Sequence, residues 1–222
     1  MGQRSQLIVK LPAKYLNENN PNNKPMRLKV YHNQWLYGSH FIQYLARLLK
    51  AIQHYGRQET NFERDAEDIL DKAIKYCNSA DIDYLTNTNL YDSKIDNYNN
   101  DFAKSKDVLD WLNSLNNDNG YMFIDMTNNH LKYCIVNGSE DNEEIKIRTA
   151  REYINLFYKD EEIINKTEWQ LLRAMEVLKN FKTTDIFKDL EKFKTELFVK
   201  EIWKTRINAK RIIAGMIGIL II

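Results

Sequence analysis

The chain has few of the residues that build the commonest catalytic and metal sites. Its 222 residues include 7 glycines, 3 prolines, 4 histidines and 2 cysteines. The glycines do not cluster, so there is no glycine-rich phosphate loop, and no serine lies in a nucleophile-elbow motif. No pair of histidines has the spacing of a zinc site. We therefore expect no metal, no cofactor and no catalytic residues, and the composition favours a binding protein over an enzyme.

Cysteine is also too scarce for a disulfide framework, because Cys77 and Cys134 lie far apart in the sequence. His130 precedes Cys134 by four positions, which on an extended strand separates the two residues by roughly 13 Å. We interpret them as a turn histidine and a core cysteine. The first residues lack the apolar run of a signal peptide. These features predict a protein of a reducing compartment, the cytoplasm.

The net charge of +1 conceals an uneven distribution of charge along the chain. Residues 1–60 contain nine Lys or Arg and two acids, whereas residues 61–145 contain seven bases and eighteen acids. Residues 146–222 are basic again, with sixteen bases and eleven acids. Such asymmetry indicates either a charged surface for a partner or two parts of one chain that attract each other on folding.

Hydrophobic periodicity predicts both strands and helices. Apolar residues alternate with polar ones in five segments: residues 5–11, 26–31, 121–126, 131–136 and 144–148. The last three are separated by polar turns and are expected to form an antiparallel meander, and the first two a hairpin. In the second segment we expect Leu28 and Val30 to face the core, and Arg27, Lys29 and Tyr31 to face solvent.

Apolar residues at helical spacing indicate several amphipathic helices between these strands and after them. Ser39 is the expected N-cap of a helix that ends at Gly56. Capping boxes that begin at Thr60, Thr149 and Thr167 open three more helices. A short helix is expected over residues 107–115, and another includes Ile186 and Leu190.

These elements together predict an α+β fold. We expect a single domain over residues 1–200, in which one mixed or mainly antiparallel sheet of about five short strands is covered by the helices. Residues 201–222 are a basic and then apolar segment, and Ile212–Ile222 contains only apolar residues and glycine. A membrane-spanning helix needs about 20 such residues. We therefore expect this segment to pack on the domain or on a partner subunit, with a membrane-associated segment as the alternative.

Cations and aromatic residues occur close together in the first part of the chain. The candidate binding residues are Arg27, Lys29, Tyr31, Trp35, Tyr37, Arg47 and Lys50. Lys and Arg that contact phosphates beside rings that stack on bases are typical of a nucleic-acid interface. Trp, Tyr and Arg also dominate the binding energy of protein interfaces. A third interpretation is structural: the aromatic residues close the core while the bases face water.

One catalytic pattern is also considered. Metal-dependent nucleases of the PD-(D/E)xK class place an Asp and then Glu-x-Lys on neighbouring strands, where the carboxylates hold Mg²⁺ and the lysine helps to activate water. Asp125 and the pair Glu144 and Lys146 have the residue types for such a site. However, the segment 131–136 separates the two parts, so a nuclease remains a second alternative to a binding protein.

The opening Gly2-Gln3-Arg4-Ser5-Gln6, followed by two strands and the turn Trp35-Leu36-Tyr37-Gly38, resembles a group of uncharacterised phage and prophage proteins of low-GC Gram-positive hosts. The resemblance extends to the Asn/Asp-Gly turn before Tyr121 and to the strands that follow it. It implies a phage accessory role in the bacterial cytoplasm. The resulting hypothesis is a non-catalytic protein that binds a host macromolecule, first of all a protein, and so modulates host physiology or defence. A nucleic-acid-binding protein is the alternative.

Overall fold

The computed structural model describes residues 4–12, 27–34, 36–79, 91–92, 106, 108–114, 119–137, 145–159 and 169–192. The strands are β1 (Arg4–Leu11), β2 (Arg27–Gln34), β3 (Tyr91–Asp92), β4 (Tyr121–Asp125), β5 (Lys132–Asn137), β6 (Lys146–Arg148) and β7 (Lys182–Thr183). The helices are α1 (Gly38–Gly56), α2 (Phe62–Ser79), α4 (Val108–Ser114), α5 (Ala150–Ile154) and α7 (Trp169–Lys179), and residues 186–192 are also helical. The predicted α+β class is confirmed.

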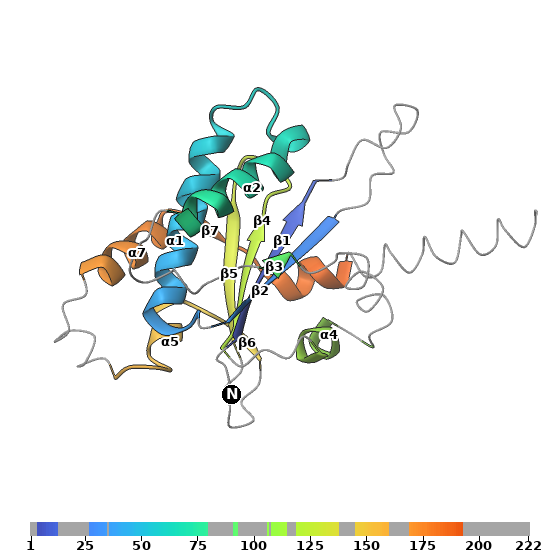
Figure 1. The fold of residues 1–222 in the computed structure, drawn as a ribbon. Coiled ribbons are helices and arrows are strands. Elements are labelled where there is room, and N and C mark those ends of the chain that lie inside the picture. Colours follow the sequence, from blue (N-terminus) through green and yellow to red (C-terminus); the bar gives the residue numbers. More distant parts are fainter. Residues whose placement is uncertain are drawn as a thin grey trace, which may run out of the picture.

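The strands form one mixed seven-stranded sheet in the order β3-β2-β1-β4-β5-β6, with β7 paired to β5 (Figure 1). The predicted β1–β2 hairpin and the β4-β5-β6 meander are both present and antiparallel. The sequence did not predict that β1 and β4 are parallel neighbours, in register from Gln6 opposite Tyr121 to Lys10 opposite Asp125. This pair joins the N-terminal hairpin to the meander and lies at the centre of the sheet.

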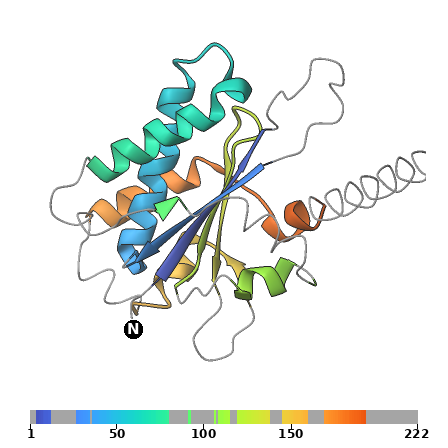
Figure 2. The same cartoon turned by 45° about the vertical axis from the view of Figure 1, so that its right-hand side comes forward.

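Helices cover both faces of the sheet. Helices α1, α2, α5 and α7 lie on one face, while α4 and the helix of residues 186–192 lie on the other (Figures 1 and 2). Each face has its own apolar core: Leu7, Val9 and Ile124 point to the first, and Ile8, Phe123 and Val136 to the second. The central strands are therefore apolar at nearly every position, as expected for strands that are buried on both sides.

This double coverage overturns the predicted orientation of β2. Leu28 and Val30 do pack in a core, but it is the core under α4. Lys29 and Tyr31 point to the opposite face, where α1 and α2 cover them and leave exposed fractions of 5% and 4%. The expectation that these two side chains face solvent is wrong, because alternation separates core from solvent only when one face of a sheet is bare.

Local capping signals were predicted with mixed success. The capping box at Thr149 is confirmed: its hydroxyl accepts a hydrogen bond from the Glu152 amide, whose carboxylate accepts one from the Thr149 amide. In α2 the cap is Asn61, whose side-chain oxygen accepts from the Arg64 amide at 3.0 Å, and not Thr60. Helix α1 ends at Gly56 as predicted, but it begins at Gly38, so Ser39 lies inside the helix.

Among the residues that the structure describes, no helix combines the length and apolar content that crossing a bilayer requires. The predicted segment Ile212–Ile222, the capping box at Thr167 and most of the chain between α2 and α4 lie outside the described residues. Their predicted structures stay predictions.

Candidate binding groove between helices α1, α2 and α7

The structure separates the seven predicted binding residues into three locations. Lys29 and Tyr31 are buried beneath α1 and α2. Tyr37 is partly buried where α1 begins, with its ring 5.9 Å from that of Phe157. Arg47 and Lys50 lie on α1 and line a surface groove. The side chains of Arg27 and Trp35 lie outside the described residues, so five of the seven can be placed and only two of these share a site.

Lys29 is held by acidic residues of α2. Its ammonium group lies 3.1 Å from the Glu67 carboxylate and 3.3 Å from the Asp71 carboxylate. Burial acts to lower the pKa of Lys29, but the Tyr31 hydroxyl, the hydrogen bond from Glu67 and the two nearby carboxylates outweigh it and raise the pKa above its ordinary value. Lys29 therefore attaches α2 to the sheet, and the basic N-terminal and acidic middle segments attract each other at this point.

The groove that contains Arg47 and Lys50 has a volume of about 680 Å³, which is within the usual range of ligand sites. Helix α1 contributes one side, α7 the other, and Tyr76 of α2 closes part of the rim. All three helices lie on the same face of the sheet, with α2 and α7 beside α1 (Figure 2). The described lining consists of Gln43, Ala46, Arg47, Lys50, Ala51, His54, Tyr55, Tyr76, Trp169, Gln170, Arg173, Ala174 and Val177.

Positive charge and aromatic surface meet in this groove. Its described lining has three permanent cations, Arg47, Lys50 and Arg173, and no carboxylate. Trp169 is 65% exposed and Tyr76 is 48% exposed, high fractions for residues of this size. The Arg173 guanidinium lies over the Trp169 ring at 5.1 Å, so a cation–π contact holds both side chains at the rim. The groove therefore suits a ligand that carries negative charge next to an apolar or flat group.

Small residues form the floor of the groove and leave it open. Ala46, Ala51 and Ala174 are buried and contribute only methyl groups. Below them Arg47 also acts on Cys77, a buried thiol at the α1–α2 contact. Burial raises the pKa of Cys77 to about 12, although the positive charge of Arg47 opposes this rise. The thiol is therefore protonated at neutral pH and unsuited to act as a nucleophile.

Sequence reasoning missed the α7 wall. Trp169 and Arg173 are four positions apart, so they share one face of their helix, and both side chains are exposed. An exposed Trp one turn before an Arg, opposite a cationic face on another helix, was the available signal. The pairing of α7 with α1 depends on the fold and has no local signature in the sequence.

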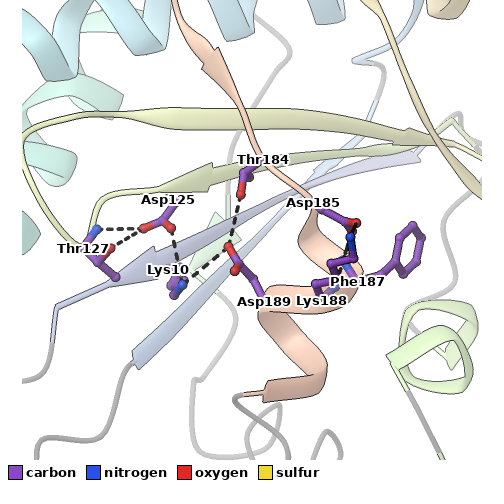
Figure 3. Close-up of polar contacts among 8 residues, drawn as sticks. All are labelled: Lys10, Asp125, Thr127, Thr184, Asp185, Phe187, Lys188 and Asp189. Carbon is purple, nitrogen blue, oxygen red and sulfur yellow. Dashed lines mark hydrogen bonds and ion pairs between the residues drawn. The ribbon is translucent and has the colours of Figure 1, made fainter.

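A second group of polar side chains lies on the opposite face of the sheet (Figure 3). The Lys10 ammonium is 3.3 Å from Asp125 Oδ2 and 3.6 Å from Asp189 Oδ2, and Lys10 and Asp125 have side chains no more than 10% exposed. Thr127 donates to Asp125 from its amide and hydroxyl, and Thr184 donates to Asp189. We call these five residues the Lys10 cluster. It ties the helix of residues 186–192 to β1 and β4.

The geometry expected of the nuclease alternative is not met by the residues that can be placed. Asp125 is paired with Lys132 at one end of β5, and Lys146 with Asn137 at its other end. Five residues of strand separate these positions, which is roughly 17 Å along the sheet. Glu144 lies outside the described residues. Within the described ranges, no three His, Cys, Asp or Glu side chains are placed to hold a metal ion.

A scan against protein-family models, a search of curated proteins and a search of solved structures gave no match to this chain. The groove and the Lys10 cluster must therefore be interpreted from their own chemistry.

Proposed function

We propose that this protein acts without catalysis, by binding a partner protein in the groove between α1, α2 and α7. The observation that carries the proposal is the exposed Trp169 and Tyr76 beside three cations, with no carboxylate in the described lining. Trp, Tyr and Arg supply most of the binding energy at protein interfaces, usually from a few residues around a pocket.

The neighbouring surface of α7 supports a protein partner over nucleic acid. Leu172 lies three positions after Trp169 and is 47% exposed. An exposed Leu beside an exposed Trp suits an apolar protein contact, whereas a polynucleotide would leave the Leu side chain without a matching surface. The resemblance of the N-terminal residues to phage proteins suggests where the partner is found. The proposed setting is the cytoplasm of a bacterial host, with modulation of a host or defence protein as the outcome.

The experiment compares groove variants with a matched control in one helix. Wild-type protein, Arg173→Glu, Trp169→Ala and Lys179→Glu are immobilised, and proteins captured from a bacterial lysate are quantified by mass spectrometry. Arg173→Glu and Lys179→Glu make the same charge change in α7, but Lys179 is an exposed residue outside the described lining. All variants are first checked for folding by circular dichroism.

A partner of the groove is captured by wild type and Lys179→Glu, and lost from the other two variants. A hot-spot residue contributes about 2 kcal/mol, which is roughly a 30-fold change in Kd once the partner is purified. Equal capture by all four proteins would show that the groove is not the binding site. Loss from Lys179→Glu as well would indicate a general charge effect.

A further inference from the structure

The charge of the groove restricts what it can hold. Arg47, Lys50 and Arg173 come from two helices and converge on one cavity, and the described lining provides no anion to neutralise them. A partner that brings carboxylates to these cations forms charge-assisted hydrogen bonds, and Arg binds a carboxylate through two parallel N–H donors. A neutral or basic segment would instead remove these cations from water without compensation.

The dimensions favour a short stretch of chain. The lining on α1 extends from Gln43 to Tyr55, about 18 Å along the helix axis, and on α7 from Trp169 to Val177, about 12 Å. An extended peptide advances about 3.3 Å per residue, so four or five residues fill this length. The alanine floor lets a backbone approach closely, and the exposed rings of Trp169 and Tyr76 offer an apolar surface to one side chain.

A peptide suits this site better than a nucleic-acid strand. Helix α2, which borders the groove through Tyr76, has exposed acidic residues at Glu63, Asp68 and Asp71. A polynucleotide carries a phosphate at every nucleotide and would meet these acids wherever it crosses α2. A peptide can place its charges opposite the three cations alone and present neutral residues elsewhere.

We infer that the segment bound in the groove is acidic, with carboxylates at Arg47, Lys50 and Arg173 and an aromatic or long aliphatic side chain against Trp169. This inference rests on the proposed protein-binding function and specifies the chemistry of the partner. The occupant is an acidic peptide segment of about four or five residues within a partner protein.

Three fluorescent probes test the inference by anisotropy with the full chain at low salt. The first is a peptide of four glutamates around one phenylalanine. The second replaces every glutamate with glutamine, and the third is an oligothymidylate of similar length. We expect the glutamate peptide to bind at least tenfold more tightly than the other two, with an affinity that falls as salt is added. Arg173→Glu should weaken this binding at least tenfold, and Lys179→Glu less than twofold.

Equal binding of the glutamate and glutamine peptides would overturn the acidic occupant, as would tighter binding of the oligothymidylate. The lysate experiment distinguishes the two levels of the proposal. If capture depends on the groove but the acidic peptide does not bind, the acidic chemistry is wrong and the groove function stands. If capture is also unaffected by the groove variants, both proposals fail together.

Discussion

Replacing Lys10 with methionine removes the cation that joins two carboxylates beneath the sheet. The methionine side chain keeps most of the aliphatic stem, so the change isolates the charge from the packing. Lys10 and Asp125 have side chains only 10% and 9% exposed, and Asp189 is 32% exposed. In Lys10→Met the Asp125 carboxylate stays buried with its Thr127 hydrogen bonds but without a countercharge.

Breaking a buried ion pair by removing one partner costs about 3–5 kcal/mol. Because solvent reaches Asp189, we expect a loss near the lower limit, about 3 kcal/mol in the free energy of unfolding. For a chain of this size, each kcal/mol shifts Tm by roughly 2–4 °C, so Tm should fall by about 6–12 °C. Circular dichroism measures Tm, and urea titration measures the free energy of unfolding.

Two further variants show whether charge causes the loss. Lys179→Met makes the same change in an exposed pair, where Lys179 lies 3.0 Å from Glu176, and should cost less than about 0.5 kcal/mol. Lys10→Met with Asp125→Asn removes the orphaned charge while the amide oxygen still accepts from Thr127, and should recover at least half of the loss. If Lys10→Met and Lys179→Met lower Tm equally, or if the double variant recovers nothing, the buried ion pair does not stabilise the fold as argued.

Three other predictions follow from the described contacts. Lys29→Met should cost about 1.5–3 kcal/mol, and because the folded-state pKa of Lys29 is raised, the difference from wild type should be constant below its ordinary pKa of 10.5 and shrink above it; a difference that grows in alkali would contradict this. Burial raises the pKa of both Cys77 and Cys134 to about 12, so a thiol reagent at pH 8 should label the native protein at least 100-fold more slowly than the urea-unfolded protein, and equal rates would refute the burial. Thr149→Ala should cost about 1 kcal/mol by removing the α5 cap; hydrogen bonds from the Thr149 backbone and side chain lower the pKa of Glu152, so its contribution is present above its ordinary pKa of 4.5, and urea titrations should show Glu152→Gln and wild type converging as pH falls below that value.

The parts of the fold that depend on local sequence were predictable. The β4-β5-β6 meander follows from alternating residues and polar turns, and the Thr149 capping box follows from a four-residue spacing. At Gly120 the backbone has a φ of 107°, and an added Cβ would lie 2.9 Å from the Val136 carbonyl oxygen, so the turn before β4 needs the glycine that predicted it.

The orientation of β2 was not predictable, because its alternation has two apolar solutions. Leu28 and Val30 have apolar neighbours under α4, while Lys29 is accommodated on the other face by Glu67 and Asp71 of a helix more than thirty residues later. A lysine in an alternating strand looks like a solvent-facing residue unless its partner is known. The charge asymmetry between the first 60 residues and the following segment was the available sign, and at Lys29 its intramolecular interpretation applies.

The candidate site was only half predictable for a similar reason. Arg47 and Lys50 belong to one helix, and their spacing places them on neighbouring positions of its surface. Trp169 and Arg173 reach the same groove from a helix about 120 positions further along the chain. Periodicity identifies α7 as amphipathic, but it does not indicate which helix packs beside it.

The two polar sites lie on opposite sides of the sheet, and this placement makes stability and binding separable. The Lys10 cluster belongs to the face covered by α4 and residues 186–192, whereas Arg173 and Trp169 belong to a helix on the other face. A sheet with a layer of helices on it places about 10 Å or more between such positions, and substitutions that far apart without shared partners usually act additively. Changes at Lys10 should therefore alter the fraction of folded protein, while changes at Arg173 should alter affinity at constant stability. The groove can consequently be tested by substitutions that leave the core intact, which is the condition under which a lost partner indicates a binding site.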